Sequence, residues 1–256
     1  MVESPSTRFS VRRVLVQEFA TEKNSYPPNE NSHMTNTTRK PSARFEDPLN
    51  LFSYAFTKLY SLWLRGTYPF ASLGSNLSIH PTIVLSRRVA PGIKMGSFVI
   101  IRNNAWLNTV DVAESEGGIK IVIDDHCVIN AQAVISAKNN IHLEREVMVS
   151  ACALIMDHNH AYEDIGRPIQ AQGSTAGGTI RIEQGCWIGH GAAIVCGQGE
   201  LVIGRNSVVA ANALVTRSFP PYSVIVGNPA RLARRFDTEK GIWVGGPTHP
   251  VVGEHL

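Results

Sequence analysis

The sequence has little net charge, no paired cysteine motif and no long hydrophobic run. Its 24 basic and 21 acidic residues leave a formal charge of +3, which does not favour a nucleic-acid groove. No apolar stretch is long enough to span a bilayer, and the first residues lack the apolar core of a secretion signal. The four cysteines form no CxxC pair, so we expect small buried thiols in a reducing, cytoplasmic compartment.

The N-terminal residues divide into two regions. Residues 1–43 are rich in Ser, Thr, Asn and Pro and are expected to form a disordered extension, within which Met34 is an alternative start. A helical cap is predicted over 44–72. Asp47 followed by Pro48 is typical of a helix start, apolar residues then recur at helical spacing, and Gly66 ends the pattern.

From Leu73 onward, aliphatic residues recur every six positions in sets of three. Period six fits neither a helix nor an ordinary hairpin. It is typical of a three-sided prism, in which each side is a short strand and three sides make one coil. The six sets predict six coils over 73–226. They are Leu73, Ile79, Leu85; Met95, Ile101, Leu107; Ile123, Ile129, Ile135; Leu143, Val149, Ile155; Ile182, Ile188, Ile194; and Ile203, Val209, Val215.

The extra residues all fall between the sets, because the spacing inside each set is strict. Every insertion is therefore predicted to leave the prism at the same corner, where a rigid scaffold presents functional loops. The longest insertion, 156–181, contains the segment MDHNHAYED. The residues that precede the aliphatics are apolar on two of the three sides, and such exposed stripes predict burial between copies in a homotrimer. Cover of part of this surface by the N-terminal helix is the alternative.

This hexapeptide repeat, closed by VGNPAR and a basic run, resembles the left-handed parallel β-helix acyltransferases. The resemblance covers Leu73 to about Phe236, and it alone implies the left hand, since parallel crossovers are usually right-handed. The expected fold class is all-β: a left-handed parallel β-helix of about six coils, with an N-terminal amphipathic helix and a short C-terminal helix. The C-terminal helix and tail would occupy 227–256.

The resemblance also implies a reaction, the transfer of an acyl group from coenzyme A to a hydroxyl or an amine. The DH-x-H pattern at 157–160 is similar to the branch that modifies polysaccharides and lipopolysaccharides. Resemblance and register assign His158 as general base, since histidine suits proton removal from a sugar hydroxyl. The expected enzyme is an acetyl-CoA-dependent O-acetyltransferase of sugar or polysaccharide precursors. The alternatives are transfer to a small amine or to serine, and a non-catalytic scaffold.

Other polar residues near the insertion are candidates for the acceptor site. His160 is the second candidate for the base, and Asp157, Glu163 or a backbone carbonyl would orient the imidazole. Asn108, Asp157 and His160 are expected to contact the acceptor. A zinc site built from His158, His160 and His190 is disfavoured, because the spacing differs from that of the zinc carbonic anhydrases that share this fold. No metal is therefore expected.

The coenzyme A site is assigned position by position from the same resemblance. The WIG turn and the next coil would line a pantetheine groove between subunits, and basic residues would meet the phosphates. The assigned residues are Trp187, Gly189, His190, Ala211, Thr216, Arg217, Arg231 and Arg234. Interface packing explains Trp187 equally well, and a solvated basic face explains the arginines. The glycine-rich segment 165–182 lacks the Lys-Ser/Thr of a phosphate loop and is predicted to be a mobile flap.

Overall fold

The computed structural model describes residues 48–110 and 118–246 of the chain. The chain divides into two compact units, 1–55 and 56–256. The first is described only by the start of helix α2 (Pro48–Thr67), and the predicted extension over 1–43 lies outside the described residues. The second contains the rest of α2, all the strands, and two short 3₁₀ helices, η3 (Ala90–Gly92) and η4 (Ile169–Ala171).

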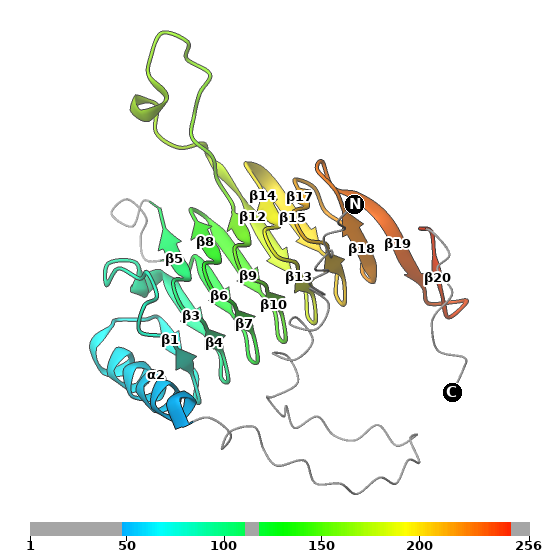
Figure 1. The fold of residues 1–256 in the computed structure, drawn as a ribbon. Coiled ribbons are helices and arrows are strands. Elements are labelled where there is room, and N and C mark those ends of the chain that lie inside the picture. The colour runs from blue at the N-terminus through cyan, green and yellow to red at the C-terminus, as the bar shows by residue number, and fades with distance from the viewer. Residues whose placement is uncertain (1–47, 111–117, 247–256) are drawn as a thin grey trace, which may run out of the picture. The chain divides into compact units, whose positions relative to one another are not determined.

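The strands form three sheets whose neighbours are parallel throughout the repeat, as Figure 1 shows for the ladder of short arrows. The first sheet contains β1 (Ser72–Leu73), β3 (Ile93–Met95), β6 (Ile121–Ile123), β9 (Asn140–Leu143), β12 (Gly177–Ile182) and β15 (Gln198–Ile203). The second contains β2 (Ser78–Ile79), β4 (Ile100–Ile101), β7 (Val128–Ile129), β10 (Met148–Val149), β13 (Trp187–Ile188), β16 (Val208–Val209), β18 (Ser223–Val226), β19 (Arg231–Asp237) and β20 (Ile242–Val244). The third contains β5 (Trp106–Thr109), β8 (Val134–Ala137), β11 (Leu154–Met156), β14 (Ala193–Val195) and β17 (Leu214–Val215).

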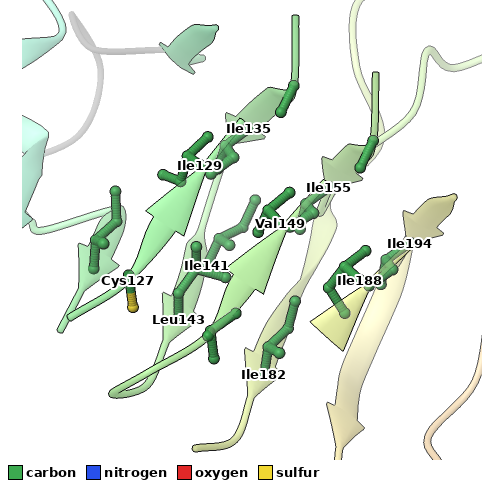
Figure 2. Close-up of a cluster of buried hydrophobic side chains, with 14 of the residues drawn as sticks. Cys127, Ile129, Ile135, Ile141, Leu143, Val149, Ile155, Ile182, Ile188 and Ile194 are labelled. Carbon is green, nitrogen blue, oxygen red and sulfur yellow. The ribbon is translucent and has the colours of Figure 1, made fainter. Parts of the chain in front are cut away.

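The residues of the period-six pattern form the core of these coils. Ile135, Ile155 and Ile194 are aligned across neighbouring strands of the third sheet, and each is 0% exposed (Figure 2). Ile129 and Ile188 occupy the same position in the second sheet. Fully burying such a side chain contributes roughly 1.5–3 kcal/mol, so the stacked aliphatics dominate the stability of the column. The predicted β-helix core is confirmed at these positions.

Two of the three corners use the left-handed backbone conformation. The third residue after an inward aliphatic repeatedly has a positive φ, and Asn or Gly is typical of such positions. These residues are Asn76, Phe98, Asn104, His126, Gln132, Glu146, Cys152, Gly185, Gly191, Asn206, Asn212 and Tyr222. At Gly185, φ is +72° and a Cβ atom would collide with Asn206 Oδ1 of the next coil. Glycine adopts this conformation without strain and leaves room for the Asn206 side chain, whereas an alanine there would be strained and would displace that side chain.

All the long connections lie at the third corner, which joins the third sheet to the first. The segment 157–176 connects β11 to β12 and extends away from the coils as the longest loop in Figure 1. The other two corners keep four residues between strands, as in 189–192 between β13 and β14. The prediction that every insertion leaves at one corner is confirmed.

The prediction of a C-terminal helix after VGNPAR is wrong. Residues Arg231–Asp237 form β19, which pairs antiparallel with β18, and β20 then pairs antiparallel with β19. The free edge of β18 offers a row of backbone hydrogen bonds, and this pairing overrides the weak helical preference of an exposed basic segment. Phe236 on β19 also packs edge-on against Trp243, with ring centroids 5.5 Å apart.

Candidate active site

His158 lies where the longest insertion leaves the third sheet. β11 ends at Met156, and the next two residues turn into the insertion. His158 Nδ1 lies 3.1 Å from Oδ1 of Asp157, and the side chains of the two residues are 11% and 0% exposed. Among the described residues, none hydrogen-bonds to the other ring nitrogen, Nε2. The carboxylate therefore orients the ring and leaves Nε2 available to a substrate.

Asp157 is held by the preceding coil. Its Oδ1 accepts a hydrogen bond from the backbone N–H of Lys138 at 2.6 Å, and its Oδ2 accepts one from that of Asn139 at 2.8 Å. Its backbone carbonyl accepts the N–H of Gly178, at the other end of the insertion, at 2.7 Å. A buried carboxylate is stable only with such partners. Asp157 is thus a fixed anchor that ties both ends of the insertion to the coil.

This burial does not agree with the acceptor contact predicted for Asp157. Asp157 is 0% exposed, and its two carboxylate oxygens already accept hydrogen bonds from the backbone N–H groups of Lys138 and Asn139. The sequence left open whether Asp157, Glu163 or a backbone carbonyl orients the imidazole, and the structure places Asp157 in that position. Glu163 lies further along the insertion and is exposed.

The base of the insertion is a short ribbon attached to the preceding coil. Thr175 donates its backbone N–H to the Asn159 carbonyl at 2.7 Å, and Ala161 donates its own to Gly173 at 3.0 Å. Lys138 Nζ donates to Ser174 Oγ at 2.7 Å and to the Thr175 carbonyl at 2.6 Å. Lys138 was missed by the sequence analysis, because SAKNN resembles any polar corner. Mobility of the flap stays a prediction, but its base is hydrogen-bonded.

The exposed residues of the flap include His160, the second histidine of the motif. Its backbone forms an isolated antiparallel bridge with Ser174. Because its side chain is exposed, it remains accessible to a ligand, whereas His158 is nearly enclosed. His190 lies at a different corner of the coil, so the three histidines of the disfavoured zinc site are not brought together. Within the described ranges, no three His, Cys, Asp or Glu side chains gather as metal ligands.

Asn108 lies on a row of residues that leads to the histidine. It pairs with Ser136, which in turn pairs with Met156 at the end of β11. Its Nδ2 donates to Ser136 Oγ at 3.1 Å. Strands in a sheet are about 4.8 Å apart, so Asn108 is about 10 Å from Met156. A sugar-sized acceptor bound against this row would reach both Asn108 and His158.

The small residues assigned to the pantetheine groove meet at the corner between the second and third sheets. A Cβ atom on Gly189 would lie 2.7 Å from the backbone nitrogen of Ala211, so only glycine allows this close packing. His190 accepts a hydrogen bond from the N–H of Asn212 at 2.9 Å through its carbonyl, and its side chain is exposed. The structure therefore brings Gly189, His190 and Ala211 together on successive coils.

This corner lies across the third sheet from His158. A strand of the third sheet and its flanking residues separate the two corners. Six residues at about 3.3 Å per residue place them about 20 Å apart. Within one chain, the assigned coenzyme residues at Gly189 and the histidine therefore do not line a single compact cleft.

The remaining assigned residues fall on two surfaces. Thr216 and Arg217 follow β17 at the same corner as His158, and the Arg217 guanidinium lies 5.3 Å from the centre of the Phe219 ring. Arg231 and Arg234 lie on β19, opposite Val226 and Val224 of β18. The Nε of Arg234 is buried with no hydrogen-bond partner among the described residues. A buried donor of this kind suits an anionic ligand such as a phosphate.

Trp187 is half exposed on the outer face of the second sheet. Its Nε1 donates to Ser150 Oγ of the preceding coil at 2.8 Å, which fixes the ring orientation. The side chain remains 44% exposed, so its large apolar face is available to a ligand or to another chain. The structure therefore agrees with both explanations of Trp187, contact with a ligand and packing against another subunit.

The fold and the site described above are those of a hexapeptide-repeat β-helix protein. No protein-family model matches the sequence. A Mycobacterium tuberculosis protein named as a probable acetyltransferase is 29% identical over 162 residues, which cover 63% of this chain and 49% of that protein. The Escherichia coli protein WbbJ, named for O-acetyl transfer in lipopolysaccharide biosynthesis, is 24% identical over 157 residues, which cover 56% of this chain and 79% of its own.

Solved structures agree on the fold. An N-acyltransferase from Bacillus cereus, in complex with dTDP and coenzyme A, superposes with a TM-score of 0.55 at 18% identity, covering 70% of this chain and 90% of its own. The repeat and these relatives show that the chain is similar to the hexapeptide-repeat acetyltransferases. It spans about half the length of the Mycobacterium tuberculosis relative.

Proposed function

We propose that this protein is an acetyl-CoA-dependent O-acetyltransferase that acts on a hydroxyl of a sugar or polysaccharide precursor. The observation that carries the proposal is the Asp157–His158 pair at the base of the longest insertion. The relative named for lipopolysaccharide O-acetyl transfer supports the acceptor class. The DH-x-H pattern supports the same class.

His158 acts as the general base. Its Nδ1–H donates to Asp157, so the lone pair of Nε2 accepts the proton of the acceptor hydroxyl. The acceptor oxygen bonds to the thioester carbonyl carbon, the carbon–sulfur bond then breaks, and the departing thiolate takes the proton back from the imidazolium. Asp157 stays ionised and stabilises the charged ring. A positioned base of this kind contributes roughly 10²–10⁴ in rate.

The donor would be bound between copies of the chain. His158 and the corner at Gly189 are about 20 Å apart within one chain. A second copy that brings its own corner against His158 would complete a cleft. Large apolar side chains on the two outer faces support a homotrimer, since Val84, Trp106 and Trp187 are 51%, 44% and 44% exposed. Arg217, Arg231 and Arg234 would meet the phosphates of coenzyme A.

A second candidate is N-acyl transfer to an amine. The Bacillus cereus enzyme with the same fold is an N-acyltransferase, so the fold alone does not separate the two reactions. We also propose a cytoplasmic location, where acetyl-CoA is made. The four cysteines are free thiols, which suits a reducing compartment.

The test is thiol release from acetyl-CoA with a panel of free sugars, nucleotide-linked sugars, serine and amines. A sugar-dependent release supports O-acetyl transfer, an amine-dependent release supports the second candidate, and no release by any acceptor would indicate a scaffold. His158→Ala should abolish turnover and leave coenzyme A binding nearly intact. His160→Ala is the matched control from the same ribbon and should keep most of the activity. Turnover by the His158 variant would refute the assignment of the base.

A further inference from the structure

A row of side chains on the outer face of the third sheet leads to the base of the longest insertion. Asn108 of β5 pairs with Ser136 of β8, and Ser136 pairs with Met156 of β11. Met156 pairs in turn with Val195 of β14. Each of the four directly follows an inward aliphatic of the repeat, so their side chains point to the outer face. His158 comes two residues after Met156, which places the proposed base at the middle of this row.

The two halves of the row differ in polarity. Met156 and Val195 are half-buried and apolar, so their side chains offer an acceptor molecule no strong hydrogen bond. Asn108 and Ser136 lie on the other side of the histidine, toward the earlier coils, and both are polar. Within this row, an acceptor that carries several hydroxyl groups therefore finds its partners in the half that contains the asparagine.

Ser136 fixes the orientation of the Asn108 amide. Ser136 is only 6% exposed, and its Oγ accepts a hydrogen bond from Nδ2 of Asn108 at 3.1 Å. Because the amide is planar, a nitrogen that faces Ser136 turns the oxygen Oδ1 away from it. None of the described residues donates a hydrogen bond to Oδ1, and Asn108 is half-buried. The row thus presents one oriented hydrogen-bond acceptor to a ligand.

We propose that Ser136 is a positioning residue, which holds Asn108 so that its amide oxygen accepts a second hydroxyl group of the acceptor molecule. The enzyme then selects acceptors that carry a hydroxyl donor besides the hydroxyl that reacts. Asn108 and Met156 are about 10 Å apart, a span that suits a sugar ring with hydroxyls on both sides and exceeds the reach of serine or a simple alcohol. The inference rests on the proposed function, since the reacting hydroxyl is the one that His158 deprotonates.

The opposite orientation of the amide predicts a different selectivity. If Oδ1 faced Ser136, the serine hydroxyl would donate to it, and Nδ2 would select an oxygen without a proton on the ligand. Substitution of Asn108 by aspartate separates the two cases, because a carboxylate only accepts hydrogen bonds. In the proposed orientation, Asn108→Asp keeps the contact with the second hydroxyl, and Ser136 donates to the other carboxylate oxygen.

The experiment measures thiol release with a sugar that the enzyme accepts and with its deoxy analogues, each of which lacks one non-reacting hydroxyl. For the parent chain, one analogue should have a kcat/KM about tenfold or more below that of the sugar, because Oδ1 loses its partner. Asn108→Ala should react equally poorly with both, whereas Asn108→Asp should keep the discrimination. Asn103→Ala is the matched control, since this asparagine is exposed on the same coil between β4 and β5 and should behave like the parent.

Ser136→Ala tests the positioning role directly. It should raise the KM of the sugar about threefold to tenfold and leave the KM of acetyl-CoA unchanged. Adding Asn108→Asp should restore the sugar KM, because a carboxylate presents an acceptor oxygen in either orientation. A merely structural serine would not be rescued in this way. Circular dichroism shows that the variants are folded.

Two results would overturn the inference while the proposed function stands. One is equal turnover of the sugar and all its deoxy analogues by the parent chain. The other is a loss of discrimination by Asn108→Asp as complete as that of Asn108→Ala. If no sugar supports thiol release, the proposed function fails, and this inference fails with it.

Discussion

Replacing Asp157 with Asn tests the orientation of His158 with the smallest change of shape. The carboxylate accepts hydrogen bonds from two backbone N–H groups, at 2.6 Å and 2.8 Å, and lies 3.1 Å from the imidazole Nδ1. An amide supplies one acceptor oxygen and one donor nitrogen. If Nδ2 faces Asn139, two donors oppose each other. If it faces Lys138, it also meets His158 and favours the tautomer that carries the proton on Nε2.

Either orientation has two measurable consequences. One buried donor loses its partner, which should lower the free energy of unfolding by about 1–3 kcal/mol. The base loses the charge that stabilises the imidazolium in both orientations, and its preferred tautomer when Nδ2 faces Lys138, so kcat should fall by roughly 10²–10⁴. The KM for acetyl-CoA should stay unchanged, because the hydrogen bonds of Asp157 go to Lys138, Asn139, His158 and Gly178 and to none of the residues assigned to coenzyme A.

The assay combines steady-state thiol release with denaturant unfolding of the same preparations. Asp164→Asn is the matched control, since this carboxylate lies in the same insertion, is exposed, and accepts the N–H of Gly166 at 2.9 Å. The control should keep both kcat and stability. A kcat of the Asp157 variant within about threefold of the parent value would refute the reasoning, and Asp157 would then have a structural role only.

Three further outcomes follow from the structure. Gly185→Ala should destabilise the fold by about 1–2 kcal/mol or more, because alanine is strained at a φ of +72°. Gly66→Ala is the control and should not destabilise the fold, because the space around its Cβ is open. Thermal unfolding compares the two variants, and equal midpoints would contradict the corner geometry. Lys138→Met removes the hydrogen bonds from Nζ to Ser174 and Thr175, so it should speed proteolysis within the insertion and raise the KM of the acceptor without changing coenzyme affinity. An unchanged rate of cleavage would show that the lysine does not hold the ribbon. Burial raises the pKa of the Cys127 and Cys186 thiols from 9.0 to about 12. The folded chain then holds protons that the unfolded chain loses, so the free energy of unfolding should fall as pH rises above about 9; a flat profile in urea titrations would show that these thiols ionise freely.

The sequence predicts the coil because each inward position contacts its equivalents in the neighbouring coils. Ile135, Ile155 and Ile194 must all be large and apolar, and their spacing within each set cannot change without moving a strand. The insertions are equally visible, since they interrupt the rhythm only between sets. Residue types at the corners are less informative. Phe98 and Tyr222 have positive φ values of 59° and 61°, although neither type is typical of that conformation.

The contacts that define the site were less predictable, because they join residues that are far apart in the sequence. The N–H groups that hold Asp157 come from residues 18 and 19 positions earlier, and Lys138 reaches 36 and 37 positions ahead. They become visible only when the coils are stacked. The C-terminal strand β19 was missed for a related reason. Its local pattern favoured a helix, whereas the open edge of β18 determined its conformation.

The change from parallel to antiparallel pairing at β18 and β19 has a consequence for assembly. A column of parallel strands repeats the same pattern of donors and acceptors at its end, so another copy could in principle dock there and extend it. β19 runs in the opposite direction and presents a different pattern to any newcomer. Removal of Arg231–Val244 should therefore expose a propagating edge and lead to fibrous polymers.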